Sequence, residues 1–301
     1  MALADPLEGV DLASPAEVTR VFREAAAANL DAGCRKGSVD EVDPVGTLTA
    51  TGDLHDNPVN FARVLKLAAL DRSTEEHPRR VTLHEIVHGS LMGGLDFSYR
   101  ALARAAALKA RLPERVHTLL ANHELAQVVG SGISKDGVNV VEAFDDGVAQ
   151  VFGDEAEGVL GAIRSFIRSM PLALVSGRGT GRGVLCAHSL PTPVMQDRFD
   201  PGVLDRALEE ADYEPRKGSA HLMVWGRGHT PEWLDELARV WGVELFLLGH
   251  EKAETGVRYV PPRAVVLNSD HDRGAVLAVD LASPPSASEA AWEGVPLATA
   301  D

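Results

Sequence analysis

The sequence predicts an α/β fold, in which helices cover a largely buried sheet. Short apolar segments of strand length alternate with helical segments from residue 45 to residue 281. Apolar residues make up 45% of the 301 residues and charged residues 24%, which is typical of a globular chain and argues against wholesale disorder. Strands that alternate with helices in this way favour a sheet with helices on its faces.

The first predicted helix begins at Pro15. Ser14 can serve as its N-cap, the proline suits the first helical position, and Glu17 can close a capping box. Because residues 31–44 are polar and interrupted by glycine and proline, we expect residues 1–44 to form a helical extension docked on the main body.

The main domain is predicted to span residues 45–281. Strands are predicted at 45–51, 80–83, 116–121, 183–187, 221–225, 243–248, 264–267 and 274–281. Helices are predicted at 58–70, 99–112, 155–168, 201–211 and 231–241. Residues 282–301 are mostly small and polar, which predicts a disordered tail.

Polar side chains follow five of the predicted strands, at the points where these strands end. They are Asp53 and His55; His84, Glu85 and His88; Asn122, His123 and Glu124; His188; and His250. A single histidine at a strand end is usually a hydrogen-bonded structural residue. Since ligands of open α/β sheets bind beyond the carboxyl ends of the strands, five such tips together predict one pocket.

The ligand types at these tips predict a dinuclear metal site. Nitrogen and oxygen ligands without thiolates suit Mn, Fe or Zn. About six candidate ligands exceed the three or four that one ion needs, so two adjacent divalent or trivalent ions are expected. A two-metal site holds both oxygens of a phosphoryl displacement and lowers the pKa of a bound water.

The charge and hydropathy of the chain exclude other classes of function. The 29 basic and 44 acidic residues give a net charge of −15, which argues against nucleic acid and anionic membranes as partners. No run approaches the ~20 apolar residues of a membrane span, and the N-terminus lacks the features of a secretory signal. Cys34 and Cys186 do not make a disulfide framework, and a cytoplasmic location is expected.

The order of the motifs resembles the calcineurin-like metallophosphoesterase superfamily, and most of all its phosphoprotein phosphatase branch. The resemblance rests on Gly52-Asp53-Leu54-His55, Asn122-His123-Glu124, His188 and Gly249-His250, with further similarity at 169–177, 186–191, 268–270 and 274–280. It covers about residues 45–281 in collinear order. It implies a central mixed β-sheet sandwich flanked by helices.

The resemblance also implies a role for each residue. Asp53 and His55 would bind the first metal ion, and Asn122, His188 and His250 would complete the pair of sites. His123 would protonate the leaving-group oxygen without binding metal. Glu124 would orient this histidine or its loop.

The second motif departs from the family pattern G-D-x-V-D-R-G. Alignment without a gap places Glu85 at the bridging aspartate, His88 at the second aspartate and Gly89 at the phosphate-clamping arginine. We prefer Glu85 as the bridge because a carboxylate has two oxygens, whereas neutral imidazole has one lone pair for a metal. A one-residue shift would place His84 there instead and would put the dinuclear site in doubt. Arg100 could fold back to replace the missing arginine, although its spacing does not require this.

The last motif reads Gly249-His250-Glu251-Lys252, whereas many members of the superfamily have Gly-His-x-His. The phosphoprotein phosphatase branch also keeps only the first histidine. Arg227-Gly228 resembles an Arg-Gly pair that helps to hold phosphate in that branch, and the planar guanidinium suits such a contact.

The expected function is metal-dependent hydrolysis of phosphomonoesters, similar to that of protein Ser/Thr phosphatases, by attack of an activated water. The substrate would be a phosphoprotein or a small phosphoester, Arg227 would neutralise phosphate oxygens, and His88 would hydrogen-bond His123 and tune it. Residues 126–152 would overhang the pocket and set specificity. Two alternatives stay open: a nucleotide or dinucleoside-polyphosphate hydrolase, and a degenerate metal-binding scaffold without activity.

Overall fold

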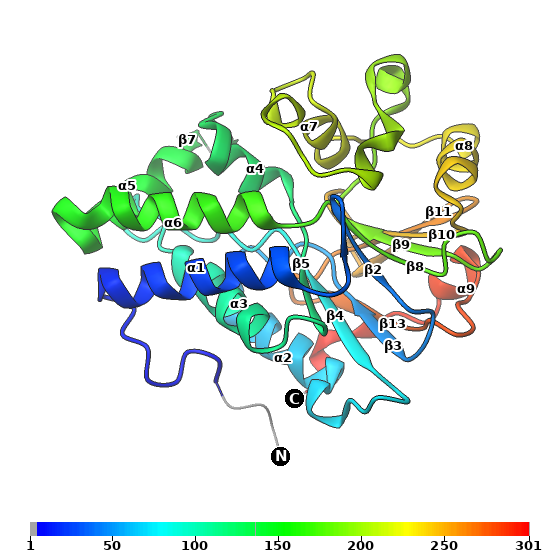
Figure 1. Cartoon of the computed structure of the whole chain (residues 1–301), viewed down its shortest axis with the longest axis horizontal. Helices are drawn as coiled ribbons and strands as arrows, with labels where there is room; N and C mark the ends of the chain where they lie inside the picture. The colour runs from blue at the N-terminus through cyan, green and yellow to red at the C-terminus, as the bar shows by residue number, and fades with distance from the viewer. Residues whose placement is uncertain (1–4, 136, 301) are drawn as a thin grey trace.

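Two β-sheets lie face to face in the middle of the molecule, and helices cover their outer faces (Figure 1). The computed structural model describes residues 5–135 and 137–300. The larger sheet has the order β1 (Arg35–Lys36), β2 (Val39–Val42), β8 (Ala173–Ser176), β9 (Val184–Ala187), β10 (Leu245–Leu248), β12 (Ala264–Leu267) and β11 (Val257–Val260). The smaller sheet has the order β14 (Val295–Pro296), β13 (Ala275–Asp280), β3 (Thr47–Ala50), β4 (Arg79–Leu83) and β5 (Val116–Thr118). A short hairpin pairs β6 (Ser134–Lys135) with β7 (Val138–Asn139).

The strands that carry the predicted site run in the same direction. In the smaller sheet β3, β4 and β5 are parallel, and in the larger sheet β9, β10 and β12 are parallel. A parallel bridge between Asp53 and Asn268 connects the end of β3 to the end of β12, so both sets of strands end on the same side. Antiparallel β8, β11, β13 and β14 make both sheets mixed, as the resemblance implied.

Alternate residues of the strands face two different apolar layers. In β10, Leu245 and Leu247 belong to the layer between the sheets, together with residues of β3 and β13. Phe246 and Leu248 face the other way and belong to the larger cluster under the helices. All of β10 is buried because both of its faces are covered, which explains its continuous apolar sequence.

Helices pack in two groups around the sheets. On one side lie α1 (Pro15–Asp31), α3 (Tyr99–Arg111), α5 (Val140–Phe152) and α6 (Ala156–Ser169), with α4 (Asn122–Val129) beside α6 (Figure 1). The other helices are α2 (Pro58–Ala68), α7 (Ser219–Val224), α8 (Pro231–Trp241) and α9 (Ala287–Ala290). Short 3-10 helices are η1 (Leu70–Arg72), η2 (Gly153–Glu155), η3 (Pro193–Arg198), η4 (Pro201–Asp205), η5 (Glu210–Tyr213) and η6 (Leu297–Ala300). No described helix is long and apolar enough to cross a membrane.

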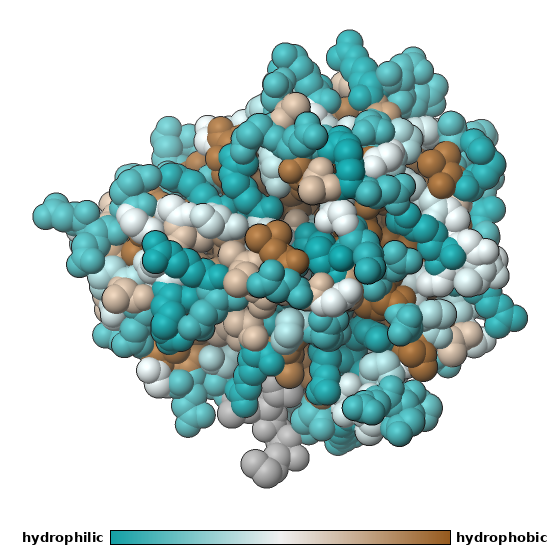
Figure 2. Space-filling view, viewed as in Figure 1, coloured by the Kyte–Doolittle hydropathy of each residue, from teal (hydrophilic) through white to brown (hydrophobic). Residues whose placement is uncertain are grey.

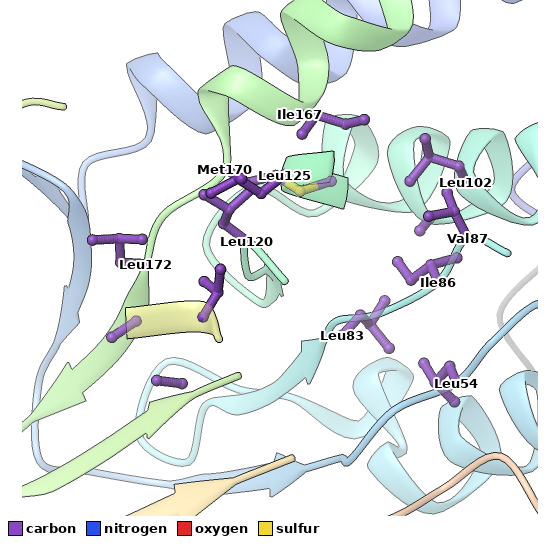
Figure 3. Close-up of a cluster of buried hydrophobic side chains, with 14 of the residues drawn as sticks. Leu54, Leu83, Ile86, Val87, Leu102, Leu120, Leu125, Ile167, Met170 and Leu172 are labelled. Atoms are coloured by element: carbon purple, nitrogen blue, oxygen red, sulfur yellow. The ribbon is translucent and has the colours of Figure 1, made fainter. Parts of the chain in front are cut away.

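An apolar cluster supports the loops that follow β4 and β5. Leu83, Ile86 and Val87 lie in one row of this cluster, opposite Leu102 of α3 (Figure 3). Leu120 and Leu125 flank the start of α4 and lie near Met170 (Figure 3). The backbone on either side of Glu85 and Asn122 is therefore anchored in the core, although these residues themselves are polar.

The first helix has the predicted cap with one difference. The Ser14 hydroxyl accepts the amide N–H of Glu17 at 3.4 Å. The Glu17 carboxylate accepts the amide N–H of Asp11 at 2.8 Å, so it ties down the preceding loop instead of closing the capping box.

Two predicted elements were wrong. Residues 221–225, predicted as a strand, lie mostly in helix α7, because a short apolar run does not distinguish a buried helix from a buried strand. Residues 201–211, predicted as one helix, form η4 and the start of η5. Arg206 interrupts the helix: its guanidinium binds Asp200 and Asp212, and a capping box between Glu209 and Asp212 starts a new turn.

Both ends of the chain have structure that the sequence analysis did not predict. Strand β2 pairs with β8, so residues 39–42 are part of the larger sheet. Residues 282–300 differ from the expected disordered tail because they contain α9, β14 and η6. A capping box between Ser286 and Glu289 starts α9, and Leu297 is buried. The division of the chain at residues 44 and 281 stays a prediction.

A buried ionic network joins the edges of the two sheets. Asp40 of β2 accepts hydrogen bonds from His117 Nδ1 of β5 at 2.8 Å and from Arg35 Nε at 3.0 Å. Lys109 Nζ of α3 lies 3.9 Å from the same carboxylate, and both side chains are fully buried. Burial alone would raise the pKa of Asp40, but His117, Lys109 and Arg35 hold it below its usual value.

We expect Asp40→Asn to lower the free energy of unfolding at pH 7 by about 3–5 kcal/mol, because it leaves the buried Lys109 cation without its carboxylate. The native pKa of Asp40 is depressed, so its contribution is present above the unfolded value of about 3.9 and is lost as the pH falls through the native value. Urea unfolding of both proteins should show a difference that shrinks below about pH 4. A difference that stays constant down to pH 3, or one equal to that of the exposed control Asp197→Asn, would contradict this role.

Candidate metal centre

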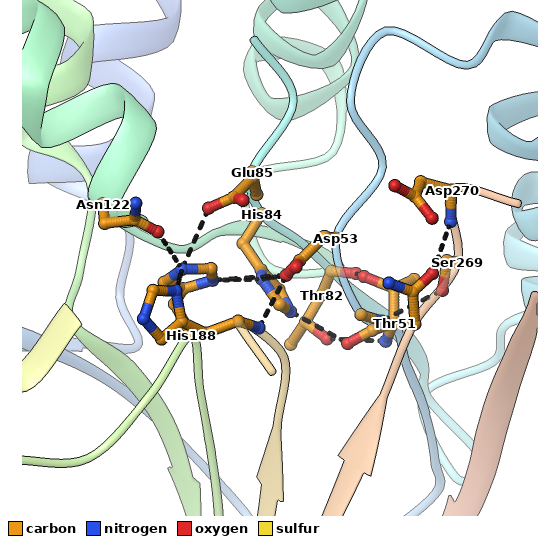
Figure 4. Close-up of polar contacts among 12 residues, drawn as sticks. Thr51, Asp53, Thr82, His84, Glu85, Asn122, His188, Ser269 and Asp270 are labelled. Carbon is orange, nitrogen blue, oxygen red and sulfur yellow. Dashed lines mark hydrogen bonds and ion pairs between the residues drawn. The ribbon is translucent and has the colours of Figure 1, made fainter. Parts of the chain in front are cut away.

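The five predicted strand ends meet at one place, and Figure 4 shows four of them, at Asp53, Glu85, Asn122 and His188. Asp53 lies just beyond β3, Glu85 two residues after β4, and Asn122 at the start of α4, which follows β5. His188 directly follows β9, and His250 lies two residues after β10. These residues come from both sheets, and each is at least 94% buried.

One group of ligand atoms surrounds the Nε2 atom of His188. Asn122 Oδ1 lies 2.6 Å from it, Glu85 Oε2 2.9 Å and His250 Nδ1 3.1 Å. Ligand atoms around one ion, each at about 2.0–2.2 Å from the metal, lie roughly 3.0–3.5 Å apart. The observed separations are close to this range.

A second group lies around the other oxygen of Glu85. His55 Nε2 is 3.0 Å from Glu85 Oε1, and His123 Nε2 is 3.8 Å from it. The other ring nitrogen of His55 contacts the carbonyl oxygen of Val87 at 3.1 Å, which directs Nε2 toward the glutamate. Asp53 forms a third group with His84 and His188, because its Oδ1 lies 3.8 Å from His84 Nδ1 and 3.5 Å from His188 Nδ1.

Glu85 therefore connects the two groups through its two carboxylate oxygens. Its backbone is in the left-handed region with φ +49°, and its carbonyl accepts the amide N–H groups of Leu54 (3.0 Å) and His55 (2.7 Å). His55 and His250 also have positive φ, at +42° and +66°. Such conformations are unfavourable for residues with side chains and persist where the surrounding structure imposes them.

Two glycines permit this close approach. A Cβ atom on Gly52 would lie 2.0 Å from the carbonyl oxygen of Leu267 at the end of β12. A Cβ atom on Gly249 would lie 2.5 Å from Asp53 Oδ1 and 2.5 Å from His84 Cε1. Both contacts are shorter than real Cβ atoms make, so the glycines that precede Asp53 and His250 are required by the packing of the site.

His84 and Glu85 occupy different places, which bears on the question of the bridging residue. The Glu85 carboxylate contacts both groups, whereas His84 lies against His188 and is 1% exposed. Its Nε2 contacts the carbonyl oxygen of Thr51 at 2.8 Å, and its Nδ1 contacts His188 Nδ1 at 3.1 Å (Figure 4). With both nitrogens engaged in this way, the geometry favours Glu85 as the bridge.

Burial and neighbouring charges set the protonation states of the centre. Burial lowers the pKa of His250 to about 2 and that of His84 to about 3, so both imidazoles are neutral at pH 7. Burial alone would raise the pKa of Glu85, but His188, His55 and His123 hold it well below its usual range. Burial and the Glu85 carboxylate raise the pKa of Asp53 to about 6.

The chemistry of these groups fits metal ions. Glu85 and Asn122 Oδ1 only accept hydrogen bonds, and neutral His250 offers a ring nitrogen to the same point. One proton on His188 Nε2 cannot satisfy all three of these neighbours. A cation would stabilise this buried cluster, in which lone pairs outnumber the hydrogen-bond donors. Neutral imidazole and ionised carboxylate are the protonation states that bind a metal ion.

His123 and His88 form a separate hydrogen-bonded chain beside the centre. His88 Nδ1 lies 2.8 Å from His123 Nδ1, so the predicted contact is present. His88 Nε2 contacts Gln127 Oε1 at 3.1 Å, and Gln127 Nε2 donates to Asp145 Oδ1 at 2.5 Å. Since the amide oxygen of Gln127 accepts, His88 carries its proton on Nε2 and accepts from His123 through Nδ1.

This chain fixes the orientation of His123 toward the centre. With Nδ1 donating to His88, the remaining nitrogen, Nε2, faces Glu85. Burial and the neighbouring His123 lower the pKa of His88 to about 3, so His88 is neutral. Glu124 holds the loop that contains Glu85, because its Oε1 accepts the amide N–H groups of Ile86 (2.7 Å) and Val87 (3.2 Å).

A cavity of about 400 Å³ opens over the centre. Asp53, His55, Glu85, His123, Arg227 and His250 line it, together with Glu251, Lys252, Ala253, Glu254, Asn268, Asp270 and His271. Arg227 is held in place because its Nη1 donates to the carbonyl oxygen of His250 at 2.9 Å.

A second cavity of about 640 Å³ shares His55 and Asp270 with the first. Val138 and Val140, from the segment that we expected to overhang the pocket, line this second cavity and not the one over the centre.

Arg100 does not fold back toward the centre. Its guanidinium lies over the rings of Phe97 (5.2 Å) and Tyr99 (5.6 Å), and it lines a separate cavity of about 230 Å³. The cations among the described residues that line the 400 Å³ cavity are Arg227 and Lys252, apart from its histidines.

Sequence reasoning missed three residues that support the centre. His84 was considered only as an alternative bridge, and Gln127 and Asp145 were not singled out. Gln127 lies one helical turn after His123, so a predicted helix at 122–129 would have placed it on the same face. Nothing in the spacing signals Asp145, which lies on α5.

Comparison with known proteins agrees with this architecture. No protein-family model matches the chain, and no curated protein matches it by sequence. Among solved structures, a protein serine/threonine phosphatase from Saccharomyces cerevisiae superposes with a TM-score of 0.64 at 17% identity, over 91% of this chain and 84% of that one. A cold-active protein-tyrosine phosphatase from a psychrophilic Shewanella species superposes with a TM-score of 0.54 at 14% identity, over 81% of this chain and 78% of that one. The chain has the calcineurin-like metallophosphoesterase fold, as the order of its motifs implied, with buried histidine and carboxylate groups at the ends of its central strands.

Proposed function

We propose that the protein is a dinuclear metal-dependent phosphoesterase that hydrolyses phosphomonoesters, in the manner of protein Ser/Thr phosphatases. The observation that carries this proposal is the position of Glu85, with one oxygen 3.0 Å from His55 and the other 2.9 Å from His188. Asp53 and His55 would bind one ion, Asn122, His188 and His250 the other, and Glu85 both. Mn, Fe and Zn suit this donor set, and two such ions would supply Lewis acidity and a hydroxide near neutral pH.

The protein's own residues would bind and orient the phosphoester. Arg227, fixed beside His250, would neutralise phosphate oxygens. His123 would donate the proton at Nε2 to the leaving oxygen, while His88 holds Nδ1 and thereby the plane of the ring. Among the described residues that line the 400 Å³ cavity there is no serine, threonine or cysteine. The carboxylates and imidazoles at the centre are assigned to metal binding and proton transfer, so we propose direct attack by water without a covalent phosphoenzyme.

The charges around the centre favour a phosphoprotein over a polyphosphate as the substrate. Glu251, Glu254 and Asp270 line the cavity above the centre, and Asp56 lines the adjoining one. A dinucleoside polyphosphate would bring several negative charges close to these carboxylates, and besides the two proposed ions the described cavity lining offers Arg227 and Lys252 to balance them. A phosphoserine peptide brings one phosphate, and its chain can extend into the 640 Å³ cavity.

We expect Asp53→Ala and Asn122→Ala each to lower kcat/KM for an aryl phosphate by roughly 100-fold or more, because each removes a proposed metal ligand. The measurement is hydrolysis by Mn²⁺-loaded protein, with the exposed Asp197→Ala as the control. Bound metal per chain and the thermal unfolding curve show whether a loss comes from the site or from the fold.

Full activity in both variants or in metal-stripped protein would refute the proposal. Two bound ions without turnover of any phosphoester would instead favour the scaffold. Faster turnover of a dinucleoside tetraphosphate than of a phosphoserine peptide would favour the nucleotide hydrolase.

We expect His88→Asp to shift the basic limb of the pH–rate profile to higher pH. A general acid acts only while it is protonated, and a carboxylate at 2.8 Å from His123 would favour the protonated imidazole more than neutral His88 does. Wild type should therefore lose activity at lower pH than the variant. Profiles that coincide would show that the group at position 88 does not tune His123. The variant Gln127→Glu, which acts at the far nitrogen of His88, should give a smaller shift in the same direction.

A further inference from the structure

We propose that His84 is a positioning residue, which holds His188 in the tautomer whose Nε2 lone pair is free for a metal ion. This inference rests on the proposed function, because it concerns how one proposed metal ligand is oriented. His84 is buried and directly follows β4, and it precedes Glu85 at the place where the motif G-D-x-V-D-R-G has glycine. A polar imidazole ring at this buried position is favourable only if its two nitrogens have hydrogen-bond partners.

The carbonyl oxygen of Thr51 fixes the tautomer of His84. It lies 2.8 Å from His84 Nε2, and a carbonyl oxygen only accepts hydrogen bonds. His84 therefore carries its proton on Nε2. In the neutral ring, Nδ1 is then a lone pair that can accept.

The Nδ1 atom of His84 in turn fixes the tautomer of His188. The two Nδ1 atoms are 3.1 Å apart, and a hydrogen bond between them requires one proton (Figure 4). Since His84 Nδ1 is the acceptor, the proton belongs to His188 Nδ1. The hydrogen bonds run from Thr51 through His84 to His188, so the neutral ring of His188, which is the form that binds metal, has its lone pair on Nε2.

Asp53 is the alternative acceptor for the His188 proton, and the distances disfavour it. Asp53 Oδ1 is 3.5 Å from His188 Nδ1, which is 0.4 Å farther than His84 Nδ1. The same oxygen already accepts the amide N–H of His250 at 2.8 Å. Asp53 therefore stays available as a proposed ligand of the other ion, and His84 takes over the contact with His188.

The orientation of His188 matters because its Nε2 is the centre of one ligand group. Asn122 Oδ1, Glu85 Oε2 and His250 Nδ1 lie within 3.1 Å of it. In the other tautomer a proton on Nε2 would point into this group and would have to be lost before metal binds. Metal-bound histidines usually donate their second N–H to a carboxylate or a carbonyl oxygen, and here a neutral imidazole takes that place.

Packing at Gly249 is a second sign that His84 is built into the site. A Cβ atom on Gly249 would meet His84 Cε1 at 2.5 Å, so the end of β10 fits closely against this ring. A side chain that fills the same space without an accepting atom separates the packing role of His84 from its hydrogen bond. His84→Leu serves this purpose, whereas His84→Asn keeps an accepting oxygen near the position of Nδ1.

The test compares wild type, His84→Leu and His84→Asn. In metal-free wild type labelled with ¹⁵N-histidine, NMR correlation spectra should show a proton on His188 Nδ1 that is hydrogen-bonded to His84 Nδ1, whether or not Nε2 also carries a proton, and in His84→Leu this hydrogen bond should be lost. Titration with Mn²⁺ should show the weaker of the two sites bind about 10–100-fold more weakly in His84→Leu than in wild type. His84→Asn should recover most of this loss.

Two results would overturn the inference. One is wild-type His188 without a proton on Nδ1, which is measured without any variant. The other is a folded His84→Leu protein whose two Mn²⁺ affinities equal those of wild type. If wild type binds no metal at all, the proposed function fails, whereas the NMR measurement on metal-free protein still decides the tautomer. A signal of the His188 Nδ1 proton that is the same in wild type and in His84→Leu also counts against His84.

Discussion

The close approach of two sheets at the carboxyl ends of their strands is the constraint on which the site depends. Gly52 lies so near the backbone of β12, and Gly249 so near Asp53 and His84, that no side chain fits at either position. The bridge between Asp53 and Asn268 joins the two strand ends there. Because of this approach, ligand atoms from both sheets meet within about 3 Å of one another. A sandwich whose sheets diverged at this end would separate Asp53 and Glu85 from His188 and His250.

This arrangement collects groups that are unfavourable together without a cation. Asp53 and Glu85 are buried carboxylates close enough that the charge of Glu85 raises the pKa of Asp53. Beside them lies the imidazole of His250, whose pKa burial lowers to about 2 and whose Nδ1 faces the same point, and the backbone has positive φ at His55, Glu85 and His250. The folded core around Leu83, Ile86 and Leu120 holds these residues in place. Metal ions would bind these buried carboxylates and lone pairs and so offset the cost of burying them together, which is why the site fits metal ions.

The sequence predicted the parts of the site that directly follow strands. Asp53, Glu85, Asn122, His188 and His250 each come soon after an apolar run, so strand direction alone brings them together. Residues that act through contacts far apart in the sequence were not predictable: Asp145 reaches His88 only through Gln127, and His84 faces Thr51 and His188. The predictions for two short elements were wrong for local reasons. Residues 219–224 are as apolar as a strand, and the interruption at Arg206 depends on partners six residues away on either side.

The central claim is that Glu85 joins two metal ions, and anomalous diffraction from crystals grown with Mn²⁺ tests it most directly. The account predicts two anomalous peaks, one beside Asp53 and His55 and one beside Asn122, His188 and His250, with an oxygen of Glu85 bonded to each. A single peak, or two peaks of which neither contacts Glu85, would contradict it. Peaks that contact His84 in place of Glu85 would show that the other alignment of the second motif is correct.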